Sequence, residues 1–157
     1  MDNNSARHID DIERAMVAIR RSQSRRSLAH LAGERGTGRA GGAAFDVLDA
    51  VEAAEQSGIP ATVSGIAAAL AVDQPRASKL VAGAVDAGLV RREADQTDGR
   101  RALLVRTEAG RALTEEVRRF RRSVFAEATE EWPEADRATF ARLLTGFVDA
   151  LGRRTNR

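Results

Sequence analysis

Basic and hydrogen-bonding side chains gather in two short stretches of this chain, and their types suit contact with a nucleic acid. Arg and Lys neutralise phosphates and bond guanine edges, whereas Gln and Ser exchange hydrogen bonds with bases and phosphates. An Asp can hold a neighbouring arginine in a fixed rotamer through paired hydrogen bonds. The candidate DNA-binding residues are Gln74, Arg76, Ser78, Lys79, Asp98, Arg100 and Arg101.

The first stretch opens the second helix of a predicted helix-turn-helix. Thr62 or Ser64 can accept backbone N–H bonds at the start of a short helix over residues 66–70, and residues 71–73 form the turn. Asp73 suits the N-cap of a second helix over residues 74–87, and Gly88 stops it. One face of this second helix is apolar at helical spacing, so the polar side chains near its N-terminus face outward and suit the major groove. The apolar residues are Ala77, Leu80, Val81, Ala84 and Val85.

The second stretch lies at the tip of a predicted hairpin with strands over residues 89–93 and 102–106. Asp98 and Gly99 favour a turn, because glycine adopts positive φ at low cost. Arg100 and Arg101 would project near the tip, where an arginine can enter a narrow minor groove. A surface ion pair between Asp98 and one of these arginines is the simpler alternative, and it is compatible with DNA contact. A helix-turn-helix followed by such a hairpin predicts a winged helix-turn-helix.

The two ends of the chain predict amphipathic helices that need a partner. Apolar residues recur at helical spacing near both ends, and residues 33–42 are predicted to be a flexible glycine-rich break. Helices of this length cannot bury their apolar faces on a small winged domain, so we expect them to pack against a second copy. The apolar residues are Ile9, Ile12, Met16, Ile19, Phe140, Leu143, Leu144, Phe147, Val148 and Leu151.

The predicted fold is therefore mainly α-helical with a small β wing. We expect one domain over residues 1–157, with the winged helix-turn-helix at about 42–106. Dimerisation helices would span about 8–32 and 107–152, and Thr107 can cap the helix that follows the wing.

Net charge says little about the ligand, but local charge is informative. The chain has 25 Lys and Arg against 23 Asp and Glu, which gives +2 at pH 7. Residues 74–111 hold eight basic and five acidic side chains, and a dimer would double this local excess along one face. Phosphate neutralisation would then supply much of the affinity for DNA.

Several function classes find no support in the sequence. No cysteine is present, and the only histidines are His8 and His30, so neither a metal site nor another cofactor is expected. No nucleophile elbow or phosphate-binding glycine loop is found, and this argues against an enzyme. The absence of a long apolar run and of a signal pattern makes the cytoplasm the default location.

The motifs together resemble the MarR family of bacterial transcription regulators. The resemblance implies a homodimer on an inverted-repeat operator, often a repressor that a small-molecule effector relieves; the effector's binding residues are not identified. In the family pattern Ser78 and Lys79 match the groove-facing pair, and Asp98 and Arg100 match the wing motif. Many members carry Asp-Arg where this chain has Ala82 and Gly83, which puts one phosphate contact in doubt. The matching segments are 72–81, 87–92, 98–101 and 107–110.

A second function fits the same fold. A winged helix can serve as a protein-interaction module that does not bind DNA, with the second helix as an ordinary solvated helix. The basic surroundings of Ser78, Lys79 and Arg100 favour DNA instead.

Overall fold

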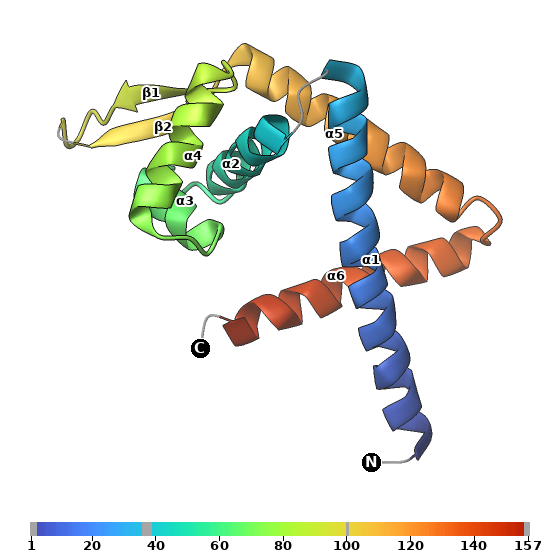
Figure 1. The fold of residues 1–157 in the computed structure, drawn as a ribbon. Helices are drawn as coiled ribbons and strands as arrows, with labels where there is room; N and C mark the ends of the chain where they lie inside the picture. Colours follow the sequence, from blue (N-terminus) through green and yellow to red (C-terminus); the bar gives the residue numbers. More distant parts are fainter. Residues whose placement is uncertain (1–2, 36–38, 100, 156–157) are drawn as a thin grey trace. The chain divides into compact units, whose positions relative to one another are not determined.

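The computed structural model describes residues 3–35, 39–99 and 101–155, which form two compact units, Met1–Glu115 and Glu116–Arg157. Six helices and a two-stranded antiparallel sheet make up the described parts of the chain (Figure 1). This confirms the predicted fold class of a mainly helical protein with a small β wing. The elements are α1 (Asn3–Arg35), α2 (Arg39–Gln56), α3 (Val63–Ala69), α4 (Gln74–Asp86), β1 (Val90–Ala94), β2 (Ala102–Arg106), α5 (Glu108–Ala128) and α6 (Glu134–Thr155).

Local capping fixes the helix-turn-helix formed by α3 and α4. The Thr62 hydroxyl accepts the Gly65 N–H at 3.1 Å, and the Asp73 carboxylate accepts the Arg76 N–H at 2.7 Å. Both caps satisfy backbone donors that have no partner inside the helix. In the turn between the helices Ala71 adopts a left-handed φ of 52°, which is unusual for a residue with a Cβ. The predicted caps at Thr62 and Asp73 are thus confirmed.

The core of the first unit lies where α2, α3 and α4 meet. Val47, Leu48 and Val51 of α2 are fully buried, and Ile66 of α3 is 2% exposed. The predicted apolar face of α4 points into this core: Ala77, Val81 and Ala84 are fully buried, while Leu80 and Val85 are partly buried. Burial of this face determines which side of α4 stays in solvent.

The wing is a regular hairpin in which each β1 residue has a partner in β2. Val90 pairs with Arg106 at the base and Ala94 with Ala102 next to the loop. The Leu104 N–H also donates to the Ala61 carbonyl at 2.9 Å, which ties β2 to the segment before α3. Figure 1 shows the hairpin beside α4 with its loop pointing away from the helices.

The expected role of Gly99 in the wing turn is wrong. Positive φ among the described glycines occurs at Gly58 and Gly88 and not at Gly99. Instead, the Arg101 N–H donates to the Asp98 carbonyl at 2.9 Å, a four-residue turn that needs no left-handed residue at its second position. Gly88, with φ 72°, ends the turn after α4 as predicted.

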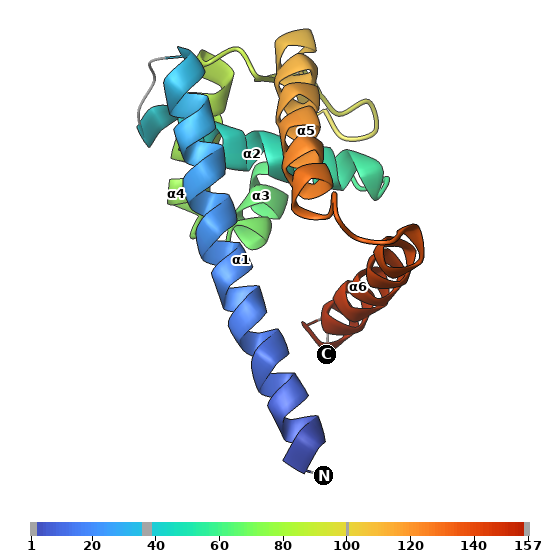
Figure 2. The ribbon, with the colours of Figure 1, turned by 90° about the vertical axis from the view of Figure 1, so that its right-hand side faces the viewer.

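The glycine-rich stretch is more helical than predicted. α1 continues through Gly33 to Arg35, and α2 already begins at Arg39, inside the expected break. A glycine costs a helix only about 1 kcal/mol relative to alanine. Ala40, Ala43 and Ala44 favour the helix in the same stretch, and α2 gains much more by burying its apolar face. The expected flexible break at 33–42 is therefore wrong for these parts, and residues 36–38 lie outside the described ranges. Figure 2 shows α1 as one unbroken helix.

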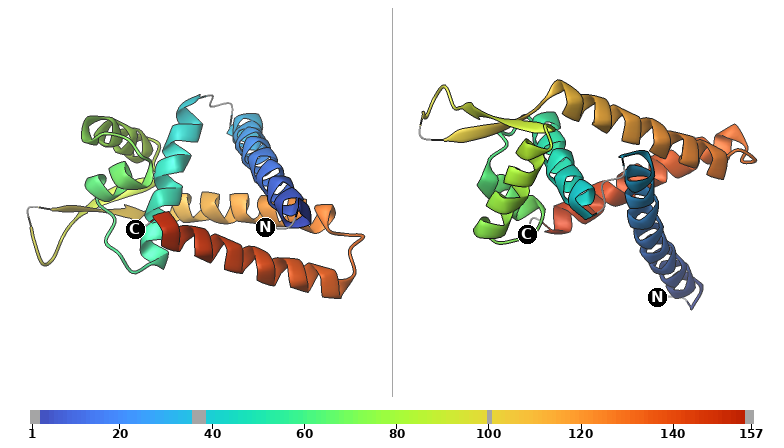
Figure 3. Two further views of the ribbon diagram at one scale, coloured as in Figure 1. Left: turned by 90° about the horizontal axis from the view of Figure 1, so that it is seen from below. Right: turned by 45° about the horizontal axis from the view of Figure 1, so that its top comes forward.

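The second unit is a helical hairpin made by the end of α5 and by α6 (Figure 3). The Arg137 guanidinium holds the connecting turn, because it donates to the Thr129 carbonyl at 2.9 Å and to the Trp132 carbonyl at 3.4 Å. The Trp132 ring meets Phe140 edge to face, with ring centroids 5.3 Å apart. No helix in the described ranges is long and apolar enough to cross a membrane. Because the structure divides into two compact units, the single domain expected over residues 1–157 remains a prediction.

Candidate nucleic-acid interface

The N-terminal half of α4 presents an exposed polar surface. Gln74, Arg76, Ser78 and Lys79 are all exposed, as the inward direction of Ala77 and Val81 requires on a helix. Within the described ranges, neither Arg76 nor Lys79 forms an ion pair with an acidic side chain. Their charges therefore remain available to an anionic ligand, close to the positive end of the helix dipole.

Gln74 has a second role that the sequence did not reveal. Its side-chain amide lies 3.4 Å from the Ser64 hydroxyl on α3, so it links the N-terminal ends of the two helices. Ser64 is itself exposed and follows the Thr62 cap. The pair extends the polar surface of α4 onto α3.

The wing loop is ordered by Asp95, a residue that was not among the predicted site residues. The Asp95 carboxylate accepts the Thr97 N–H at 2.9 Å and the Thr97 hydroxyl at 2.7 Å. These bonds hold the pKa of Asp95 below its ordinary value. The Asp95 N–H donates to the Arg101 carbonyl at 3.0 Å and closes the loop. The Asp-x-Thr spacing is a recognisable turn motif and is the signal that identifies this residue.

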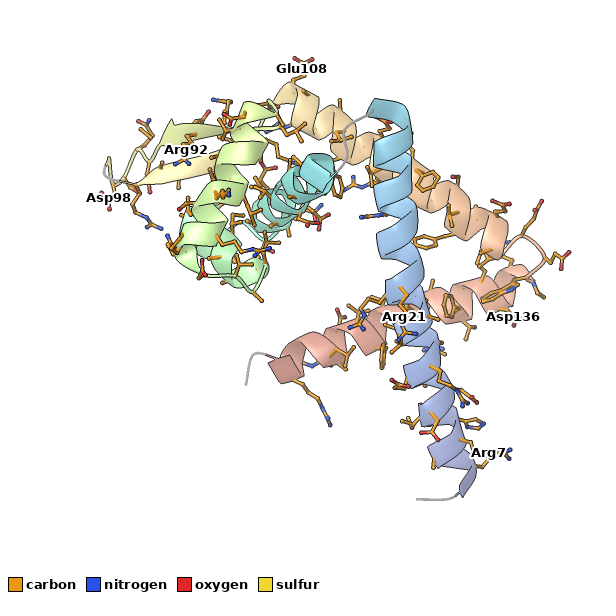
Figure 4. All side chains as sticks on the ribbon, viewed as in Figure 1. Arg7, Arg21, Arg92, Asp98, Glu108 and Asp136 are labelled. Carbon is orange, nitrogen blue, oxygen red and sulfur yellow. The ribbon has the colours of Figure 1, made fainter. Side chains whose placement is uncertain are left out.

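The predicted wing residues lie at the expected end of the hairpin. Asp98 and Arg101 are exposed, and Figure 4 shows Asp98 at the tip and Arg92 on β1. Arg100 lies outside the described residues, so its predicted projection and its pairing with Asp98 stay predictions. On β1, Arg91 forms an ion pair with Glu93, which lowers the charge that this strand offers to a ligand.

Asp46 is the acidic group on α2 with a raised pKa. Burial raises the pKa of Asp46 above its ordinary value, and the nearby Asp49 carboxylate adds to this shift. Two neighbouring acidic side chains make this part of α2 unsuited to phosphate contact. Among the described groups, the basic side chains on α4 and in the wing thus remain the best candidates for binding an anion.

Comparison with known proteins points to one family. Residues 40–101, which include the helix-turn-helix and most of the wing, match the model of the MarR family. No curated protein matched the sequence. Among solved structures, RV1404 from Mycobacterium tuberculosis is 25% identical with a TM-score of 0.71, over 92% of this chain and 94% of that one.

Two further structures share the fold at lower identity. A MarR family protein from Bacillus stearothermophilus is 18% identical with a TM-score of 0.74, over 97% of this chain and 99% of that one. The transcriptional regulator BldR from Sulfolobus solfataricus is 21% identical with a TM-score of 0.64, over 98% and 99% of the two chains. Likeness at this identity establishes the fold of nearly the whole chain.

Proposed function

We propose that this chain, whose residues 40–101 match the model of the MarR family, is a sequence-specific regulator that binds double-stranded DNA as a homodimer. Members of this family are transcription regulators and not enzymes, which confirms the prediction of a non-enzymatic protein. We further propose a repressor that a small-molecule effector releases from its operator. Such a regulator works where the chromosome lies, which we take to be the cytoplasm.

The exposed polar half of α4 is the observation that carries the proposal. α4 buries Ala77 and Val81 completely and leaves Arg76, Ser78 and Lys79 in solvent within one and a half turns. A helix of this kind fits the major groove, which is about 12 Å wide, and its N-terminal residues then meet base edges. The wing loop with Asp98, Arg100 and Arg101 would meet the neighbouring minor groove.

A homodimer would present two such surfaces to DNA. The apolar faces near both ends of the chain would form the dimer interface, through helices at about 8–32 and 107–152, while residues 42–106 form the DNA-binding part. Two-fold symmetry then requires an inverted-repeat operator, with half-sites about 10 base pairs apart from centre to centre.

Changing Lys79 to alanine tests whether α4 reads DNA. We expect a loss of roughly 1–3 kcal/mol per half-site if Lys79 bonds a base edge. The measurement is a gel shift on an operator selected from genomic fragments, compared with random DNA of equal length. Equal weakening on both DNAs would assign Lys79 to the phosphate backbone. A wild-type protein that retards no DNA at low salt would instead favour the protein-interaction module.

Introducing an arginine at Gly83 should strengthen DNA binding. Gly83 is exposed in the second half of α4, and a Cβ there would meet no atom within 4 Å. If this position faces phosphate, Gly83→Arg should make the slope of log affinity against log salt steeper by about 0.9 per added contact. Gly83→Ala is the matched control, because it gives the same gain in helix propensity without the charge. Identical salt slopes for the two variants would place residue 83 away from the DNA.

A further inference from the structure

Three charged side chains meet at the base of the wing, where the end of β2 contacts α2. The Arg106 guanidinium at the end of β2 lies 3.1 Å from a Glu52 carboxylate oxygen and 2.7 Å from a Glu55 carboxylate oxygen, both on α2. Arg106 Nε makes a further bond of 2.9 Å to Glu55. The three side chains are only 14%, 12% and 27% exposed, in the order Arg106, Glu52 and Glu55.

This network fixes the orientation of its side chains more than it stabilises the folded protein. Charged groups that leave water lose solvation, and apolar side chains of similar volume often stabilise such a position equally well. Burial tends to raise the pKa of Glu55, but hydrogen bonds from Arg106 outweigh this and hold the pKa below its ordinary value. Glu55 is therefore ionised, and the planar guanidinium bonds two carboxylates in one fixed orientation.

The position of Arg106 in the hairpin makes that orientation important. Arg106 pairs with Val90 in the register and so shares its inner face, where Val90 is 1% exposed. A two-stranded hairpin is marginally stable by itself, so its direction depends on contacts at its base. Besides the Leu104 to Ala61 backbone bond, the Arg106 network is the polar link between the described part of β2 and the helices.

A small tilt of the hairpin at its base produces a larger displacement of its loop. A strand of five residues is about 17 Å long, so a tilt of about 10° at Arg106 would move the start of the loop by about 3 Å. A displacement of that size exceeds the tolerance of a hydrogen bond. Contacts that the loop makes with DNA would then be lost, although no loop residue had changed.

We propose that Arg106 is a positioning residue for DNA binding, which acts with Glu52 and Glu55 to set the direction of the wing and does not itself touch DNA. The inference rests on the proposed DNA-binding function. It also accounts for a basic side chain that is only 14% exposed and so offers little charge to a phosphate.

Non-additive substitutions test this role. One protein carries Arg106→Met, a second carries an Asn-Gly turn in place of residues 96–100 together with Arg101→Thr, and a third carries both sets of changes. The Asp95 N–H already donates to the Arg101 carbonyl, so this hydrogen-bonded pair can close a two-residue turn without changing the register of β1 and β2. Arg106→Met should weaken operator binding roughly tenfold in the normal protein and less than twofold in the short-wing protein.

Lys79→Ala provides the control background. Because α4 meets DNA independently of the wing, Arg106→Met should cost the same factor with or without Lys79. Equal tenfold losses in the normal and short-wing proteins would overturn the proposal, since Arg106 would then act on the whole domain.

A second variant distinguishes the positioning role from a loss of binding caused by unfolding. Arg106→Lys keeps a positive charge beside the carboxylates but lacks the planar fork, so it should fold and still weaken operator binding. Amide hydrogen exchange should quicken in β1 and β2 of this variant and stay unchanged in α4. The positioning role would be overturned if amide exchange became faster throughout the protein, or if it did not become faster in β1 and β2. If the wild-type protein binds no DNA, the proposed function fails, while the exchange experiment still decides whether Arg106 anchors the wing.

Discussion

Replacing Gly110 by alanine should destabilise the protein by about 3 kcal/mol, the upper end of the usual cost of overpacking. An added Cβ would lie 2.1 Å from the Leu89 carbonyl oxygen and 3.0 Å from Leu48 Cδ1. The first of these atoms belongs to the backbone and is itself bonded to the Thr107 N–H at 3.1 Å. The start of α5 would have to move away from the turn after α4, and the midpoint of thermal unfolding should fall by roughly 6–12 °C.

Gly83→Ala separates this clash from the ordinary effect of removing a glycine. Gly83 is helical and exposed, and its Cβ would meet nothing within 4 Å. Alanine there should stabilise α4 by about 0.5–1 kcal/mol. If both variants unfold at the same temperature as wild type, the close approach of α5 to Leu89 is not a constraint on the fold.

Features that depend on neighbouring residues were predictable from the sequence. Thr107 is an example: its hydroxyl accepts the Gly110 N–H at 3.0 Å and donates to the Gly88 carbonyl at 2.6 Å. The predicted cap of α5 is thus confirmed, and the hydroxyl also joins α5 to the end of the α4 turn. Capping, helical spacing and turn formation depend on residues a few positions apart, so they can be recognised from the sequence alone.

Features that depend on distant residues were not predictable. Arg106 counted as one of eight basic residues near the proposed DNA surface, yet its charge is bonded to Glu52 and Glu55 more than fifty positions earlier. The close approach at Gly110 likewise needs Leu48 of α2. Such contacts arise from packing among helices, which periodicity alone does not specify. The local charge count therefore overstated what this region offers to phosphate.

The apolar faces of α1 and α6 agree with the predicted need for a partner. Ile9, Ile12 and Ile19 of α1 are 43–54% exposed in the single chain. The large apolar side chains of α6 are exposed to a similar degree, and they follow one face of the helix. Single exposed apolar residues are normal on a protein surface, but a continuous stripe of this kind marks an interaction site. The α6 residues are Phe140 (45%), Leu143 (57%), Leu144 (37%), Val148 (54%) and Leu151 (46%).

Changing Leu143 to glutamate should therefore convert the proposed dimer to monomer. A buried leucine contributes about 2 kcal/mol, and two-fold symmetry means that the dimer loses two of them. The dissociation constant of the dimer should therefore rise about a thousandfold, and the cost of burying the glutamate charges would raise it further. Leu143 is 57% exposed in the single chain, so each subunit should stay folded.

Arg142→Glu is the matched control, since it adds the same side chain on the opposite side of α6. Sedimentation at micromolar concentration should show a monomer for Leu143→Glu and a dimer for wild type and Arg142→Glu. A well-behaved wild-type monomer at that concentration would contradict the homodimer, and with it the inverted-repeat operator that two-fold symmetry requires.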